Sequence, residues 1–139
     1  MKFRKVKNRS DRKKLRDDIG ALQLILLKLQ RGDKDEITGT PAKGLGRFHI
    51  LRVASHPRLE FEPLNILLVN WMPTHFNWHH AGPNDPKNLK TLERIKEIRG
   101  IDYEIALKKI EVTKQKHDTL YFEALKLYFK GEVRQYKEV

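Results

Sequence analysis

Two short apolar runs and a histidine-rich segment, all between Arg47 and His80, constrain the fold of this chain most strongly. This stretch holds five of the six histidines and both tryptophans. Phe48 to Ala54 and Ile66 to Val69 are rich in β-branched and aromatic residues, and Leu59 to Phe61 is expected to be a further extended run that is broken at Pro63. Such runs, bounded by turn-forming residues, are typical of strands. The stretch therefore predicts a β-hairpin.

A short helix is expected directly after the hairpin. Thr74 is a suitable N-cap for a helix that begins at His75. On such a helix His75 and His79 face the same way, so their two imidazoles can hold one divalent metal ion. The same spacing also arises by chance, and His80 stands beside His79 as an alternative second ligand.

His49 and Asn65 are the candidates for chemistry on the hairpin. Cleavage of a phosphodiester needs a base that activates water and a cation beside the phosphate. A neutral imidazole, which titrates near pH 6.5, suits the first task, and His49 lies inside the first apolar run. Asn65, sixteen residues later, could hydrogen-bond the loop that carries His49 and fix the ring. Taken singly, His49 also reads as a half-buried strand residue and Asn65 as a turn former.

The order of these residues resembles that of a known family. The likeness extends from about Leu27 to Leu107 and rests on five segments: Arg31–Gly39, Phe48–Ile50, Ser55–Arg58, Phe61–Ile66 and Thr74–His75. They resemble the HNH, or ββα-metal (His-Me finger), endonucleases, and within them the phage recombination endonucleases of the NinG/Rap type. The resemblance implies a core of one β-hairpin and one helix, and an enzyme that hydrolyses DNA in recombination or junction processing.

The resemblance also implies roles for individual residues. In that family the first histidine is the general base, the asparagine orients it and the final histidine binds metal. These roles carry over to His49 as the base and Asn65 as the residue that orients it. His75 would be the catalytic metal ligand, with His79 or His80 as a further ligand. The implied cofactor is a divalent ion, Mg²⁺ or Mn²⁺, with Zn²⁺ as an alternative.

Two features depart from the family pattern. Many relatives carry Asp or His just before the base, where it helps to bind the metal, but this chain has Phe48 there. Many also carry cysteine pairs that hold zinc around the core, and this chain has no cysteine. We therefore expect packing alone to hold the fold. The alternative function is a non-catalytic, basic nucleic-acid-binding protein on a degenerate HNH scaffold.

The composition favours a polyanionic partner. The net charge is +11 and the pI about 9.9, as in many nucleic-acid-binding proteins, ribosomal and chromatin types included. The lack of cysteine excludes disulfide and thiolate chemistry. No apolar run approaches the ~20 residues of a membrane span, and the N-terminus lacks the apolar core of a secretory signal. We expect DNA as the partner, no membrane, and the cytoplasm of a bacterial or phage-infected cell.

The first part of the chain is expected to be a basic arm followed by a helix. Nine residues up to Arg16 are Lys or Arg, and one is acidic. Five cations of the arm are expected to contact phosphate: Lys2, Arg4, Lys5, Lys7 and Arg9. Ser10 is the expected N-cap of a helix that ends near Arg31, with Gly32 as its stop.

Five apolar residues recur at helical spacing within this helix and form one apolar stripe. Its members are Leu15, Ile19, Leu22, Leu26 and Leu29. The stripe is expected to pack in the core of the protein. The alternative is a homodimer interface, because further leucine and isoleucine residues widen the apolar surface of the helix.

The rest of the chain is expected to be loops and helices. Three cations near the hairpin could line a DNA-facing side: Lys43, Arg47 and Arg52. Asp85 and Asp102 read as helix N-caps and Gly100 as a helix stop, whereas His56 and His117 are expected on the surface.

The chain is thus predicted to be one mostly helical α+β domain, residues 1–139. Its parts would be a basic arm and helix (1–31), a ββα-metal core (32–81) and C-terminal helices (82–139).

Overall fold

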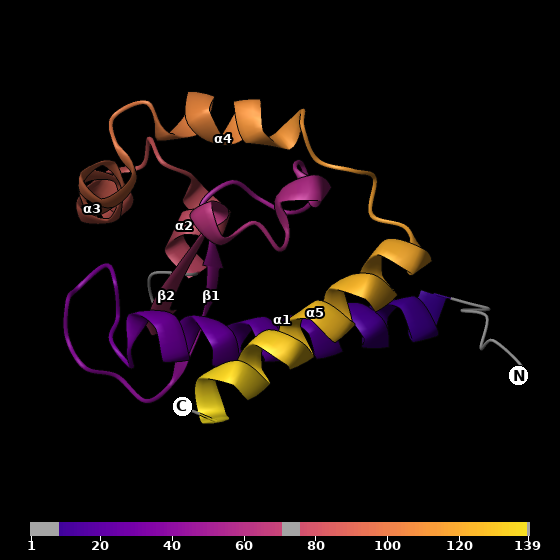
Figure 1. The fold of residues 1–139 in the computed structure, drawn as a ribbon. Coiled ribbons are helices and arrows are strands. Elements are labelled where there is room, and N and C mark those ends of the chain that lie inside the picture. Colours follow the sequence, from indigo (N-terminus) through magenta and orange to yellow (C-terminus); the bar gives the residue numbers. More distant parts are fainter. Residues whose placement is uncertain (1–8, 71–75, 139) are drawn as a thin grey trace, which may run out of the picture. The chain divides into compact units, whose positions relative to one another are not determined.

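A computed structural model of the chain describes residues 9–70 and 76–138 (Figure 1). The described residues form a mostly helical α+β fold with one two-stranded antiparallel sheet, as expected from the sequence. They divide into two compact units. The first, unit 1, contains the helices nearest the two ends of the chain, and the second, unit 2, is the continuous segment Arg31–Gln115. The single domain expected from the chain length stays a prediction.

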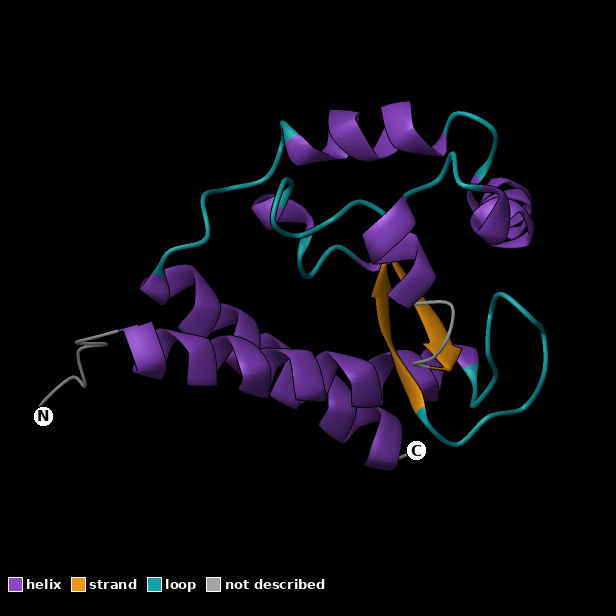
Figure 2. Cartoon of the chain, turned by 180° about the vertical axis from the view of Figure 1, so that it is seen from behind, coloured by secondary structure: helices purple, strands orange, loops and turns teal. Residues whose placement is uncertain are grey.

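Unit 1 consists of two helices, α1 (Arg9–Arg31) and α5 (Thr119–Glu138). They run side by side and in the same direction in both views (Figures 1 and 2). The Lys126 ammonium lies 3.2 Å from the Asp18 carboxylate, and the Arg12 guanidinium lies over the Phe122 ring. The buried apolar side chains of the pair include Ile19, Leu26, Phe122 and Phe129.

The ends of the helices in unit 1 differ partly from expectation. Gly32, with φ of +88°, follows the last residue of α1 and confirms the expected stop. Ser10 lies inside α1, so the expectation that it caps this helix is wrong. Asp118 caps α5, because its Oδ1 accepts the Tyr121 N–H at 2.8 Å. His117 is buried and stacked on Tyr121, which corrects its expected surface position.

The hairpin of unit 2 pairs β1 (Leu45–His49) with β2 (Ile66–Asn70), so that His49 lies opposite Ile66. The expected first strand, Phe48 to Ala54, therefore begins and ends too late in the chain. The chain turns away after Ile50, because Leu51 bonds to the Asn65 side chain and His56 N–H closes a turn onto the Arg52 carbonyl.

The segment between the strands contains two short 3₁₀ helices, η1 (Pro57–Leu59) and η2 (Pro63–Asn65). Each begins with a proline, whose fixed φ and missing N–H suit the first position of a helix. The extended run expected from Leu59 to Phe61 is therefore wrong.

The outer edge of β2 is covered by the loop after α1. The Glu36 N–H donates to the Leu68 carbonyl at 2.7 Å, and the Glu36 carboxylate accepts the Leu68 N–H at 2.7 Å. Asp35 accepts the Asn70 N–H in the same way, at 2.8 Å. Two acidic residues thus bond backbone groups of an edge that would otherwise invite another strand.

Three helices complete unit 2: α2 (Phe76–Ala81), α3 (Leu89–Arg99) and α4 (Tyr103–Glu111). Asp85 caps the 3₁₀ turn η4 (Pro86–Asn88) that leads into α3, and Gly100, with φ of +98°, follows α3, both as expected. Asp102 precedes α4 but makes no side-chain cap bond.

The core of unit 2 joins these helices to the hairpin. It contains nine buried residues: Phe48, Ile50, Leu59, Leu67, Val69, Trp78, Ile95, Tyr103 and Leu107. The Trp78 indole N–H donates to the Ile50 carbonyl at 3.0 Å, which ties α2 to the end of β1. None of the helices among the described residues is long and apolar enough to cross a membrane.

Candidate functional site

His49 is the last residue of β1 and is half-buried. Its Nε2 lies 2.8 Å from the backbone carbonyl oxygen of Glu60. A carbonyl oxygen can only accept, so this bond requires the hydrogen on Nε2 and makes Nδ1 the unprotonated nitrogen of the neutral ring. The Glu60 carbonyl thus sets both the orientation and the tautomer of the imidazole.

Asn65 holds the loop from which this carbonyl comes. Its side chain is fully buried, and Oδ1 accepts the Leu51 N–H at 2.8 Å. Nδ2 donates to the Leu51 carbonyl at 3.1 Å and to the Leu59 carbonyl at 3.3 Å. The amide therefore clamps the loop both just after His49 and just before Glu60. The expected bond from Asn65 to the loop that carries His49 is present.

The histidines of α2 lie near the hairpin to different degrees. His79 is half-buried, with its ring centroid 5.9 Å from that of Phe48, whereas His80 is exposed on the same helix. Burial lowers the pKa of His79 below 6.5, and the nearby charges of Arg52 and His80 lower it further. His75 lies outside the described residues.

The metal site expected from the sequence cannot be completed without His75. In residues 9–70 and 76–138, no three His, Asp or Glu side chains gather in a group that could hold a metal ion. The two described candidates, His79 and His80, are neighbours in the last turn of α2.

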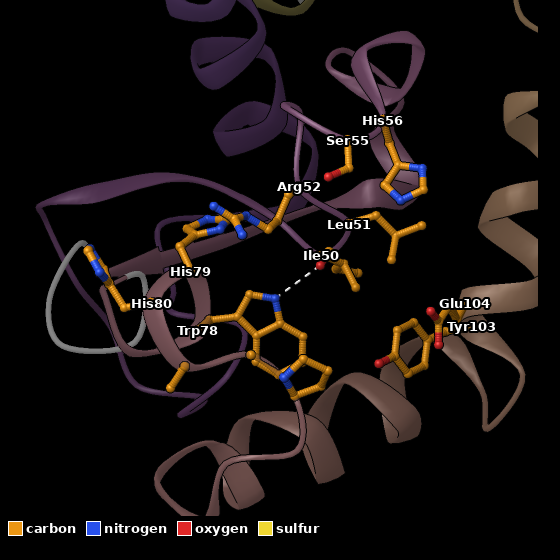
Figure 3. Close-up of a pocket in the computed structure, with 13 residues that line it drawn as sticks. Ile50, Leu51, Arg52, Ser55, His56, Trp78, His79, His80, Tyr103 and Glu104 are labelled. Carbon is orange, nitrogen blue, oxygen red and sulfur yellow. Dashed lines mark hydrogen bonds between the residues drawn. The ribbon is translucent and has the colours of Figure 1, made fainter.

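A cleft of about 320 Å³ lies beside α2 (Figure 3). His79 and His80 line one side, and Arg52 extends toward His79. His56 lines the opposite side and is held by the Glu111 carboxylate, 3.0 Å from its Nδ1. The expectation that His56 is plain turn surface is therefore incomplete, because its ring joins the loop to α4. His49 is not among the residues that line this cleft.

Phe48 occupies the position just before His49 and faces α2. It is fully buried, and its ring centroid lies 5.8 Å from that of Trp78. Because its ring also lies against His79, a side chain at position 48 faces the helix on which metal ligands are expected. Phe48 thus packs in the core at the position where the resemblance would place a metal ligand.

The cations expected to contact DNA differ in their exposure to solvent. Lys43 and Arg52 are exposed, as that role requires, whereas Arg47 is half-buried and bonds the Glu60 carbonyl. Arg9 is the first described residue of α1. Four cations of the arm lie outside the described residues: Lys2, Arg4, Lys5 and Lys7.

No sequence signal marks the Glu60 carbonyl as the hydrogen-bond partner of His49, because the partner is a backbone atom and not a side chain.

The lowered pKa of His79 leads to a test by pH. The unfolded chain takes up a proton at His79 near pH 6.5, before the folded protein does, so this residue reduces stability as the pH falls below about 6.5. His79→Gln should reduce the loss of urea-unfolding free energy between pH 7 and pH 5. If His79→Gln loses as much unfolding free energy as the wild type, the lowered pKa of His79 is contradicted. His80→Gln, at the neighbouring histidine, is the control.

Comparison of the chain with family models, curated proteins and solved structures found no match.

Proposed function

We propose that this protein is a metal-dependent DNA endonuclease of the HNH type. The observation that supports it best is the arrangement at the end of β1. There His49 donates from Nε2 to the Glu60 carbonyl, and Asn65 clamps the loop that supplies this carbonyl. A histidine, held in one tautomer by a backbone carbonyl within a clamped hairpin loop, is suited to accept a proton at a fixed point.

His49 acts as the general base in this mechanism. Nδ1 takes a proton from a water molecule whose oxygen forms a bond to phosphorus, while the bond from phosphorus to the leaving oxygen breaks. The imidazolium that results keeps its Nε2–H bond to Glu60, and the carbonyl dipole stabilises its charge. Asn65 holds the loop and does not touch the reacting atoms.

His75 and His79 would hold the divalent ion, Mg²⁺ or Mn²⁺, or Zn²⁺ as an alternative, with His80 as the other choice of second ligand. The bound ion would stabilise negative charge that develops on the phosphate. The lowered pKa of His79 fits this role, because only the neutral imidazole binds metal. Arg52, which lies toward His79, favours an anion such as phosphate in the same cleft.

DNA is the proposed substrate because the chain carries a net charge of +11. The resemblance to phage recombination endonucleases suggests junction processing in the cytoplasm of a bacterial or phage-infected cell. A homodimer through α1 is also a proposal, supported by two partly exposed side chains on this helix, Ile25 and Leu29.

Phe48 favours a second candidate function, a nucleic-acid-binding protein without catalysis. This position packs in the core against Trp78 and His79, and phenylalanine cannot serve as a metal ligand. Two imidazoles with no carboxylate form a weak site for Mg²⁺, which prefers oxygen ligands.

Incubation with supercoiled plasmid distinguishes the two functions. Purified protein is mixed with the plasmid and Mg²⁺, Mn²⁺ or Zn²⁺, and nicked and linear products are measured on a gel beside an EDTA control. Metal-dependent nicking supports the endonuclease. Plasmid that is retarded on the gel but never nicked, with any of the three ions, would favour the binding protein.

Metal binding should be weak without DNA and should depend on the histidines of α2. Calorimetric titration of Mn²⁺ or Zn²⁺ is expected to lose its signal in His75→Ala and in either His79→Ala or His80→Ala, whichever is the second ligand. A short duplex should strengthen binding, because phosphate fills sites that the protein leaves to water. Identical isotherms for the wild type and all three variants would exclude a histidine-bound metal here.

The basic arm should contribute affinity for DNA that does not depend on sequence. Deleting residues 1–8 removes Lys2, Arg4, Lys5 and Lys7 but leaves α1 from Arg9 onward. The slope of log K against log salt should become shallower by about 0.9 for each phosphate that the shortened protein no longer neutralises. Fluorescence anisotropy of a labelled duplex between low and moderate salt measures this slope. An unchanged slope would mean that the arm does not contact DNA.

A further inference from the structure

Arg47 and His49 share one hydrogen-bond acceptor. They are two residues apart on β1 and so project from the same face of the strand. The Arg47 Nη1 lies 3.3 Å, and the His49 Nε2 2.8 Å, from the carbonyl oxygen of Glu60. A carbonyl oxygen has two lone pairs, so both bonds can form at once.

A second contact holds Arg47 in this place. Its guanidinium carbon lies 5.4 Å from the centroid of the Phe61 ring, within the range of a cation–π interaction. Phe61 follows Glu60 directly and is itself buried. Arg47 therefore grips two successive residues of the loop, one by its backbone carbonyl and the other by its ring.

The loop segment Leu59–Phe61 is thus held from two directions. Asn65 bonds the Leu59 carbonyl from the interior, and Arg47 holds the next two residues from the strand. Between these contacts lies the Glu60 carbonyl, on which the orientation of His49 depends. The contacts of Arg47 therefore add a restraint on this carbonyl to those that Asn65 and the imidazole supply.

We propose that Arg47 is a positioning residue for His49. By gripping Glu60 and Phe61 it fixes the carbonyl that orients the imidazole, and it does not serve as one of the cations that bind DNA. This assignment replaces the role expected for Arg47 from its charge alone. It rests on the proposed function, because the orientation of His49 affects a rate only if this residue is the base.

Three variants test the proposal. Arg47→Met keeps an apolar side chain over Phe61 but has no N–H donor, whereas Arg47→Lys keeps a cation with donors. Lys90→Met removes an exposed cation on α3 of the same unit and is the matched control. Arg47→Met should lower kcat for plasmid nicking about 10–100-fold with little change in KM, and Arg47→Lys should recover part of the loss. Lys90→Met should leave kcat unchanged.

A spectroscopic readout separates this proposal from the proposed function. In ¹H–¹⁵N NMR spectra of the imidazoles, wild-type His49 should show the Nε2–H tautomer, with a hydrogen that exchanges slowly with water. Arg47→Met should broaden or remove this signal, and Arg47→Lys and Lys90→Met should retain it. Circular dichroism checks that each variant is folded. If Arg47→Met unfolds, Arg47→Lys decides alone, since it should give an intermediate kcat at the wild-type KM.

Two results would overturn the assignment. One is an Arg47→Met variant with wild-type kcat, an unchanged His49 signal and a raised KM, which would make Arg47 a phosphate contact. The other is a wild-type kcat in Arg47→Lys beside an unfolded Arg47→Met, which would leave only a structural role. If the wild type cleaves no DNA, the proposed function fails, and the NMR signals still decide whether Arg47 positions His49.

Discussion

Replacing His49 by alanine should slow the nicking of supercoiled plasmid by about 10²–10⁴-fold, the range that a general base contributes. The affinity for DNA should change little, because the proposed base acts on water, and His49 is bonded to the protein's own Glu60 carbonyl. Single-turnover nicking in the presence of Mn²⁺ and anisotropy with a labelled duplex measure the two quantities separately.

Two further variants make this test specific. His49→Gln keeps an N–H group that can donate to Glu60 but lacks a base, so it should fold normally and be as slow as His49→Ala. His117→Gln changes a histidine of unit 1 that stacks on Tyr121 and does not line the cleft, and it should retain the wild-type rate constant. Wild-type cleavage by His49→Gln would remove His49 from the role of base.

Replacing Asn65 by alanine should lower the free energy of unfolding by about 2–4 kcal/mol. The variant loses three hydrogen bonds and leaves the Leu51 N–H and the Leu59 carbonyl without their side-chain partner. It also opens a small void where a fully buried amide stood. Urea unfolding followed by circular dichroism at pH 7 measures the change.

The matched control is Asn84→Ala, at an exposed asparagine in the turn after α2. Its unfolding free energy should stay within about 0.5 kcal/mol of the wild type. Asn65→Ala should also slow nicking, since the loop that carries the Glu60 carbonyl loosens. A stability equal to that of Asn84→Ala would show that the amide is not a clamp.

The second strand and several helix ends could be predicted from local sequence. Ile66 to Val69 is a continuous apolar run and forms β2, and Gly32 and Gly100 end their helices because each adopts a positive φ. The first strand could not be delimited in this way. Its residues after His49 look just as strand-like, but the Asn65 side chain takes the Leu51 N–H and turns the chain away.

The candidate site could be predicted as a set of residue types but not as a geometry. His49 and Asn65 are identifiable from their order in the chain, and the bond from Asn65 to the loop follows from that. The Glu60 carbonyl could not be identified, because every residue has one and only folding selects it. The contacts of Arg47 could not be predicted for a related reason. The sequence shows that residue 47 is a cation, but it does not show that its guanidinium donates a hydrogen bond to a backbone carbonyl.

The two units differ in when they can form during synthesis. Unit 2 is one continuous segment, Arg31–Gln115, and every partner in its core is made before α5 emerges from the ribosome. Unit 1 needs α1, which is made first, and α5, which is made last. Until α5 is made, the apolar residues of α1 therefore lack their partner helix, whereas the hairpin and its clamped loop can already fold. The nine lysine and arginine residues up to Arg16 favour the solubility of this helix during that interval.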